Sequence, residues 1–227
     1  MSTQYAESQS WMFGLVAADP STREQATSRH RSMVGAARDA GHRIGRLWVR
    51  SRSGAPPRVA AELDQAQADY AWHRRQTIFG LLDDGLSPDD LVRELHAPFT
   101  VLYLAWEARD PQDWWGSHLS LESPWTLKES ALRVLARDGV SDDLRPRVTE
   151  LLLAALYRPY RCKDWMYPKL VRHLPQEPLA ARVSALLDVD DPWVRLRARF
   201  VLHHAAHPEL EVTRTAWRRW LLTDTGA

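Results

Sequence analysis

The chain has 227 residues, 44% of them hydrophobic and 26% charged, and its formal net charge at pH 7 is +1. A chain of this length can bury roughly 70% of its unfolded surface, which excludes a disordered or collagen-like protein. The one cysteine, Cys162, excludes a disulfide framework. The sequence has no run of about 18 apolar residues, so no membrane span is predicted, and the N-terminus lacks the pattern of a signal peptide. These features predict a cytoplasmic protein.

The small net charge hides an uneven distribution of charge along the chain. Residues 23–58 contain nine arginines and only two acidic residues, Glu24 and Asp39, whereas acidic residues dominate residues 61–116. The near-zero total therefore does not exclude nucleic-acid binding. The preference for arginine over lysine has a second explanation, a GC-rich genome, which would carry no functional meaning.

The N-terminal half predicts a tail followed by two long helices. Residues 1–20 show no sustained period and predict a flexible tail. Residues 21–49 predict a helix with arginines on one face, because apolar residues recur near helical spacing on the other, at Val34, Ala37, Ile44 and Trp48. Residues 51–57 predict a break, and residues 58–82 a second helix that Gly85 ends as a left-handed cap.

Residues 74–106 have the spacing of a DNA-binding motif. Ser87 is predicted to cap a short helix that reaches Leu95, a turn is predicted near residues 96–99, and Thr100 begins another helix. This spacing resembles the helix-turn-helix of resolvase-like and other bacterial DNA-binding proteins. Together with the basic helix before it, this helix-turn-helix-like helical unit is predicted to form a domain over residues 21–109.

The segment that would read DNA departs from that pattern. Residues 98–106 are nearly all apolar, whereas a recognition helix needs polar side chains that reach the edges of bases. The alternative is that this segment is buried against the rest of the protein.

A Trp-rich connection at residues 110–122 is predicted to join the two halves of the chain. Its Trp114 and Trp115, with Trp106, Trp125, Asp110, Asp113 and His118, could line a pocket that raises the pKa of a carboxylate. Such a cluster could instead pack two subdomains together.

Residues 123–222 predict three antiparallel helical hairpins, with a short tail at residues 223–227. The predicted helix pairs are 123–139 with 141–159, 164–174 with 177–187, and 191–205 with 208–222. A Pro-Trp pair follows a capping residue at Ser123 and again at Asp191. Residues 190–202 resemble the second half of a HEAT repeat, which implies a short solenoid with a concave surface that binds protein or nucleic acid.

Hairpins of this kind also resemble, more weakly, the HEAT-like alkylpurine DNA glycosylases. That resemblance implies a catalytic Asp one helical turn after a Trp, but Lys169 follows Trp165 at this distance and Asp164 precedes it. Asp113 and Asp164 are the weak catalytic candidates. The histidines His203, His204 and His207 lack the Glu of a zinc-protease pattern, so neither a metal nor a cofactor is predicted.

The sequence therefore predicts an all-α, non-enzymatic protein that binds nucleic acid, most simply DNA, in a regulatory role. A protein-interaction scaffold without nucleic acid and a HEAT-like glycosylase are the alternatives. The predicted nucleic-acid contacts are Arg43, Arg46, Arg50, Arg52, Arg74, Arg75, Arg195 and Arg199.

Overall fold

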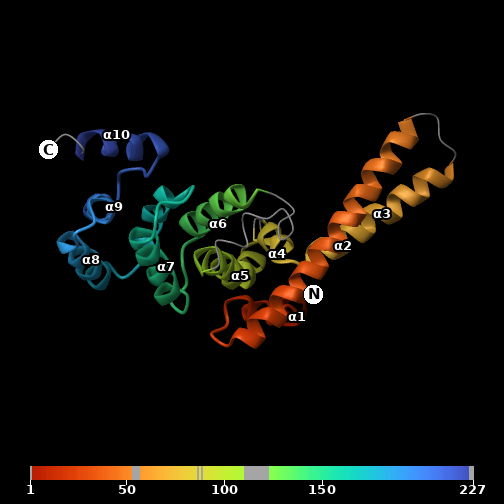
Figure 1. Ribbon diagram of the computed structural model, residues 1–227, viewed down its shortest axis with the longest axis horizontal. Coiled ribbons are helices and arrows are strands. Elements are labelled where there is room, and N and C mark those ends of the chain that lie inside the picture. Colours follow the sequence, from red (N-terminus) through yellow and green to blue (C-terminus); the bar gives the residue numbers. More distant parts are fainter. Residues whose placement is uncertain (1, 53–56, 86, 88, 110–122, 225–227) are drawn as a thin grey trace. The chain divides into compact units, whose positions relative to one another are not determined.

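The computed structural model describes residues 2–52, 57–85, 87, 89–109 and 123–224, and every regular element that they form is a helix (Figure 1). The predicted all-α class is therefore confirmed. The chain divides into an N-terminal unit, Met1–Leu127, and a C-terminal unit, Lys128–Ala227. Within the described ranges, no helix combines the length and the apolar character needed to cross a membrane.

The predicted flexible tail is wrong, because the first residues are folded. They form α1 (Ser2–Ser8) and the 3-10 helix η1 (Ser10–Val16). Met12 and Leu15 of η1 are fully buried, and the ring of Phe13 lies 5.2 Å from that of Phe99. A spacing of three residues suits a 3-10 helix, whose turn contains three residues, but it is too short a pattern to stand out in the sequence.

A long hairpin of two helices follows, formed by α2 (Pro20–Arg52) and α3 (Pro57–Arg75), which run side by side in Figure 1. The first half of α2 packs on η1, and its second half pairs with α3 around Leu47, Val59 and Ala66. Leu47 is thus buried at the position on the apolar face that the sequence pattern assigned to its neighbour Trp48. Trp48 is exposed, so its predicted place on the apolar face is wrong.

The helix predicted at residues 58–82 is divided in two by Thr77, the cap of α4 (Ile78–Asp84). The Thr77 hydroxyl donates to the Arg74 carbonyl at 2.6 Å and accepts from the Gly80 N–H at 3.4 Å. After α4, Gly85 has φ −63°, so the predicted left-handed cap is wrong.

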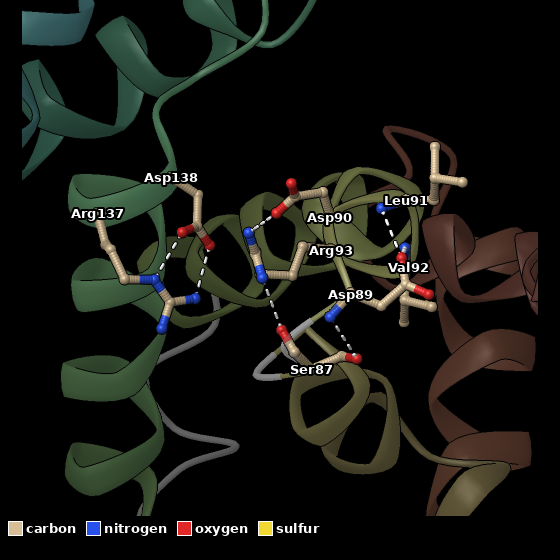
Figure 2. Close-up of polar contacts among 8 residues, drawn as sticks. All are labelled: Ser87, Asp89, Asp90, Leu91, Val92, Arg93, Arg137 and Asp138. Atoms are coloured by element: carbon tan, nitrogen blue, oxygen red, sulfur yellow. Dashed lines mark hydrogen bonds and ion pairs between the residues drawn. The ribbon is translucent and has the colours of Figure 1, made fainter.

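One continuous helix, α5 (Asp90–Arg109), replaces the predicted short helix, turn and helix. Figure 2 shows its start: Asp89 Oδ1 accepts from the Leu91 N–H at 2.9 Å, while the Ser87 hydroxyl accepts from the Asp89 N–H. Asp89 therefore caps the helix, and Ser87 lies outside it. The predicted turn at 96–99 is wrong, because α5 continues through Pro98. The alternative of a buried segment is confirmed, since residues 99–107 are all buried.

The helices from residue 124 to the end of the C-terminal unit lie close to the predicted positions. They are α6 (Pro124–Asp138), α7 (Arg145–Tyr157), η3 (Asp164–His173), α8 (Gln176–Ser184), η4 (Ala185–Asp188), α9 (Pro192–Ala206) and α10 (Arg214–Asp224). Asp191 caps α9 as predicted, and Gly139, with φ +92°, follows the end of α6. The helix predicted from residue 164 is a 3-10 helix.

α9 is the central helix of the C-terminal unit. It contacts α7, η3, α8, η4 and α10. Its buried residues include Val194, Ala198 and Val201, which share one face at helical spacing. The stacking of hairpins into a HEAT-like solenoid stays a prediction.

Candidate nucleic-acid interface

A row of exposed arginines lies on the second half of α2. Arg43, Arg46 and Arg50 are three and four residues apart, so they share one side of the helix. Arg43 pairs with Asp69 at 3.5 Å, whereas Arg46 and Arg50 have no ion pair among the described residues. Arg52 lies 3.9 Å from the ring centroid of Trp48. We call Arg43, Arg46, Arg50 and Arg52 the hairpin arginines.

Arg74 and Arg75, also predicted contacts, lie at the other end of α3 and do not join this row. The Arg74 guanidinium pairs with Asp83 at 2.7 Å and its side chain is only 14% exposed. The Arg75 carbonyl accepts a hydrogen bond from the Tyr5 hydroxyl. These two residues therefore connect α3 to α4 and α1.

The two predicted contacts on α9 differ in their surroundings. The Arg195 guanidinium donates to the carbonyls of Val189 at 2.7 Å and Asp190 at 2.9 Å, which fixes the chain before α9. Arg199 is exposed. The arginine between them, Arg197, has the most unusual position of the three.

Arg197 is held rigidly and almost completely buried. Its Nε donates to the Trp193 carbonyl at 2.9 Å and one Nη donates to the Arg158 carbonyl at 2.7 Å, with 7% of the residue exposed. Burial lowers the pKa of the guanidinium, but an arginine stays charged at neutral pH. The second Nη has no hydrogen bond among the described residues.

Arg197 lines a pocket of about 550 Å³, which we call the Trp193 pocket. Asp191 is its other charged residue, and its apolar walls are Tyr157, Pro159, Tyr160, Trp193, Trp217 and Leu221. The rings of Tyr160 and Trp217 are stacked, 9° from parallel with centroids 6.0 Å apart. Burial raises the pKa of Tyr160 to about 12, so its hydroxyl keeps its proton at neutral pH.

A second pocket of about 490 Å³, the Cys162 pocket, shares Tyr160, Trp217 and Leu221 with the first. The rest of its wall consists of Cys162 and of four basic or aromatic residues, Lys163, Trp165, Arg214 and Arg218. Cys162 is exposed with a free thiol, and Lys163 pairs with Glu129. The two pockets are therefore adjacent, with Tyr160, Trp217 and Leu221 as their common lining.

Asp164 fixes the loop that carries Tyr160 and Cys162. One carboxylate oxygen accepts from Lys128 at 2.5 Å and Arg158 at 2.7 Å, and the other accepts from the Arg161 N–H at 2.8 Å. Both Lys128 and Asp164 are buried. The structure thus places this weak catalytic candidate in an internal ion network rather than at an open surface.

The remaining candidates do not gather into a site. Asp113, Asp110, Trp114, Trp115 and His118 lie outside the described residues. Trp106 is buried beside His30 in the N-terminal unit. The ring of His203 is tilted against those of His207 and Trp220, and no group of His, Cys, Asp or Glu within the described part of the chain could hold a metal ion.

The residues that sequence reasoning missed are Tyr157 and Tyr160. One signal was present, because Tyr157, Arg158, Pro159 and Tyr160 place two aromatic residues around a proline that must leave the helix. In comparisons with known proteins, no family model, curated protein or solved structure matches the chain.

Proposed function

We propose that the protein binds nucleic acid, without catalysis, through the hairpin arginines. The observation that carries this proposal is the row Arg43, Arg46 and Arg50, exposed on one side of α2. Seven residues of helix span about 10 Å. Duplex DNA presents about six phosphate charges over that length, so the row matches a run of phosphates.

The position of the row favours phosphate contacts over base reading. Arg46, Arg50 and Arg52 are exposed, and their guanidinium groups suit phosphate oxygens. α5, which would have carried a recognition helix, is buried from Phe99 to Glu107. Phosphate contacts without base contacts give binding that depends little on sequence.

The test is the affinity of the full chain for a fluorescent 20-base-pair duplex, measured by anisotropy at about 50 mM salt. We expect the variant Arg43→Ala/Arg46→Ala/Arg50→Ala to bind at least about tenfold more weakly, because each lost phosphate contact reduces the number of counterions that binding releases.

The matched control removes three exposed arginines of the C-terminal unit, in Arg133→Ala/Arg137→Ala/Arg182→Ala. These arginines pair with Glu129, Asp138 and Glu150, and their removal changes the net charge by the same amount. An equal loss in this control, or no binding by the wild type, would contradict the proposal.

A further inference from the structure

We propose that the Trp193 and Cys162 pockets together bind nucleotides of single-stranded nucleic acid. One base stacks in the Trp193 pocket, and the adjoining phosphates contact Arg214 and Arg218 at the Cys162 pocket. This inference rests on the proposed function for its class of ligand, but it uses other residues, and the two can fail separately.

The aromatic walls are the first argument. Trp193 is 58% exposed and Tyr157 is 57% exposed, although large rings are usually buried. The volume of the Trp193 pocket, about 550 Å³, lies within the range of small-molecule sites, about 300 to 1,000 Å³. Every base has a flat π-face, so aromatic walls that are open to solvent suit a stacked base.

Two polar groups inside the same pocket suit the edge of a base. The Arg197 guanidinium is fixed by two carbonyls and keeps one Nη without a partner among the described residues. Asp191 uses Oδ1 to cap α9, accepting from the N–H groups of Trp193 and Val194, and this leaves Oδ2 without a hydrogen bond there. A fixed donor beside a fixed acceptor matches base edges, which carry both kinds of group.

Charge complementarity identifies the phosphate side. Arg214 and Arg218 are one helical turn apart on α10, both are exposed, and neither has an ion pair in the described part of the chain. Trp217 and Leu221 lie on the same side of α10 and belong to both pockets. A strand that places a base in one pocket therefore brings its backbone past these two arginines.

The geometry favours a single strand over a duplex. Bases in a duplex are stacked and paired, so a pocket can take one only when the strand is open. In a single strand, a base enters the Trp193 pocket without any cost of unpairing. The hairpin arginines, in contrast, need only an accessible backbone.

The experiment measures binding of fluorescein-labelled dT20 by the full chain, using anisotropy, with an unlabelled abasic 20-mer as competitor. We expect Trp193→Ala to weaken dT20 binding about tenfold or more, because stacking on an aromatic ring is lost. Trp193→Phe keeps a flat ring and is expected to retain most of the affinity. The abasic competitor should compete weakly, since it has phosphates but no bases.

The matched control is Trp72→Ala, since Trp72 is 64% exposed on α3 and lies in neither pocket. The variant Arg214→Gln/Arg218→Gln should weaken both dT20 and the abasic competitor. All of these residues are exposed, so folding should be retained, and the urea midpoint checks that it is.

Each outcome decides the inference separately from the proposed function. Equal binding by Trp193→Ala and Trp72→Ala, or an abasic 20-mer that binds as tightly as dT20, would overturn the inference. A wild type that binds duplex but not dT20 would overturn it too and leave the proposed function standing. The inference would be supported if the variant Arg43→Ala/Arg46→Ala/Arg50→Ala bound dT20 as tightly as the wild type while Trp193→Ala bound it more weakly.

Discussion

Asp164 shows how a single buried carboxylate can organise a surface. It joins Lys128 and Arg158 through its side chain and holds the loop that carries Tyr160 by accepting from the Arg161 N–H. Lys128 is completely buried, and its ammonium pairs with this carboxylate. The chemistry of Asp164 is therefore structural, and it determines the position of one pocket wall.

We expect Asp164→Asn to lower the free energy of unfolding by roughly 3–5 kcal/mol, because it removes the carboxylate that pairs with the buried Lys128 ammonium and with Arg158. Urea unfolding of both proteins measures the difference. The double variant Lys128→Met/Asp164→Asn should recover part of the loss, since it removes the buried ammonium together with its carboxylate partner. A single variant as stable as the wild type would show that the buried ammonium does not need this carboxylate.

His30 is a second residue whose environment gives a measurable consequence. Its Nε2 accepts from the Ile78 N–H at 3.3 Å, and its ring lies edge-on to Phe79 and Trp106. Burial lowers the pKa of His30 from 6.5 to about 3. A proton on Nε2 would face the Ile78 N–H, so the folded protein keeps this imidazole neutral.

Stability should therefore fall as the pH is lowered below 6.5. The unfolded chain binds a proton at His30 there, whereas the folded chain does not until about pH 3. Between pH 6.5 and pH 5 we expect a loss of about 2 kcal/mol from this residue, at about 1.4 kcal/mol per pH unit. Urea midpoints of the wild type and His30→Gln across this range measure it. Identical pH dependence in the two proteins would rule out this origin.

At the scale of elements, two glycines predict opposite effects of the same substitution. A Cβ at Gly80 would lie 2.5 Å from the Arg74 carbonyl oxygen and 2.7 Å from the Arg75 Cα, at the close junction of α3 and α4. A Cβ at Gly45, inside α2, would meet nothing within 4 Å.

We expect Gly80→Ala to destabilise the protein by about 1–3 kcal/mol, because backbone atoms must move. Gly45→Ala should stabilise it by about 0.5–1 kcal/mol, because alanine has less freedom in the unfolded chain and favours a helix. Thermal or urea unfolding shows whether each variant is less stable or more stable than the wild type. A stable Gly80→Ala protein would mean that α3 and α4 can separate.

The elements that sequence could predict are those whose ends carry local signals. Asp191 and Pro192 begin α9, and Gly139 follows the end of α6, because capping and positive φ depend on a few adjacent residues. The turn inside α5 could not be excluded from sequence. Pro98 costs the helix a hydrogen bond, and the burial of residues 99–107, which depends on contacts distant in sequence, offsets that cost.

The candidate site was less predictable than the fold, because exposure and pairing depend on contacts distant in sequence. Arg195, Arg197 and Arg199 look equivalent in the sequence. Only the folded chain makes Arg197 a buried wall of a pocket, through the carbonyl of Arg158, while Arg195 fixes the chain before its own helix. The hairpin arginines were easier to predict because they all lie on one helix.

At the scale of the whole molecule, the net charge of +1 underestimates how strongly the salt concentration should affect binding to duplex DNA. Binding responds to the local contacts that release counterions, not to the total charge. If all four hairpin arginines contact duplex phosphates, raising the salt concentration from about 50 to 200 mM should weaken binding by about a hundredfold.

For the variant Arg43→Ala/Arg46→Ala/Arg50→Ala, the same increase in salt should weaken duplex binding only about three- to fourfold, since only the Arg52 contact remains. Anisotropy titrations at several salt concentrations give, for each protein, the slope of the logarithm of affinity against the logarithm of salt concentration. Equal slopes for the two proteins would assign the phosphate contacts to another part of the chain.

The position of Cys162 has a practical consequence. It is the one cysteine of the sequence, its thiol is exposed, and it lies in the wall of a pocket beside Arg214 and Arg218. A maleimide dye would therefore attach at this single point in the unaltered chain. Its emission would report directly whether a ligand enters, and how fast, without engineering a reporter into the protein.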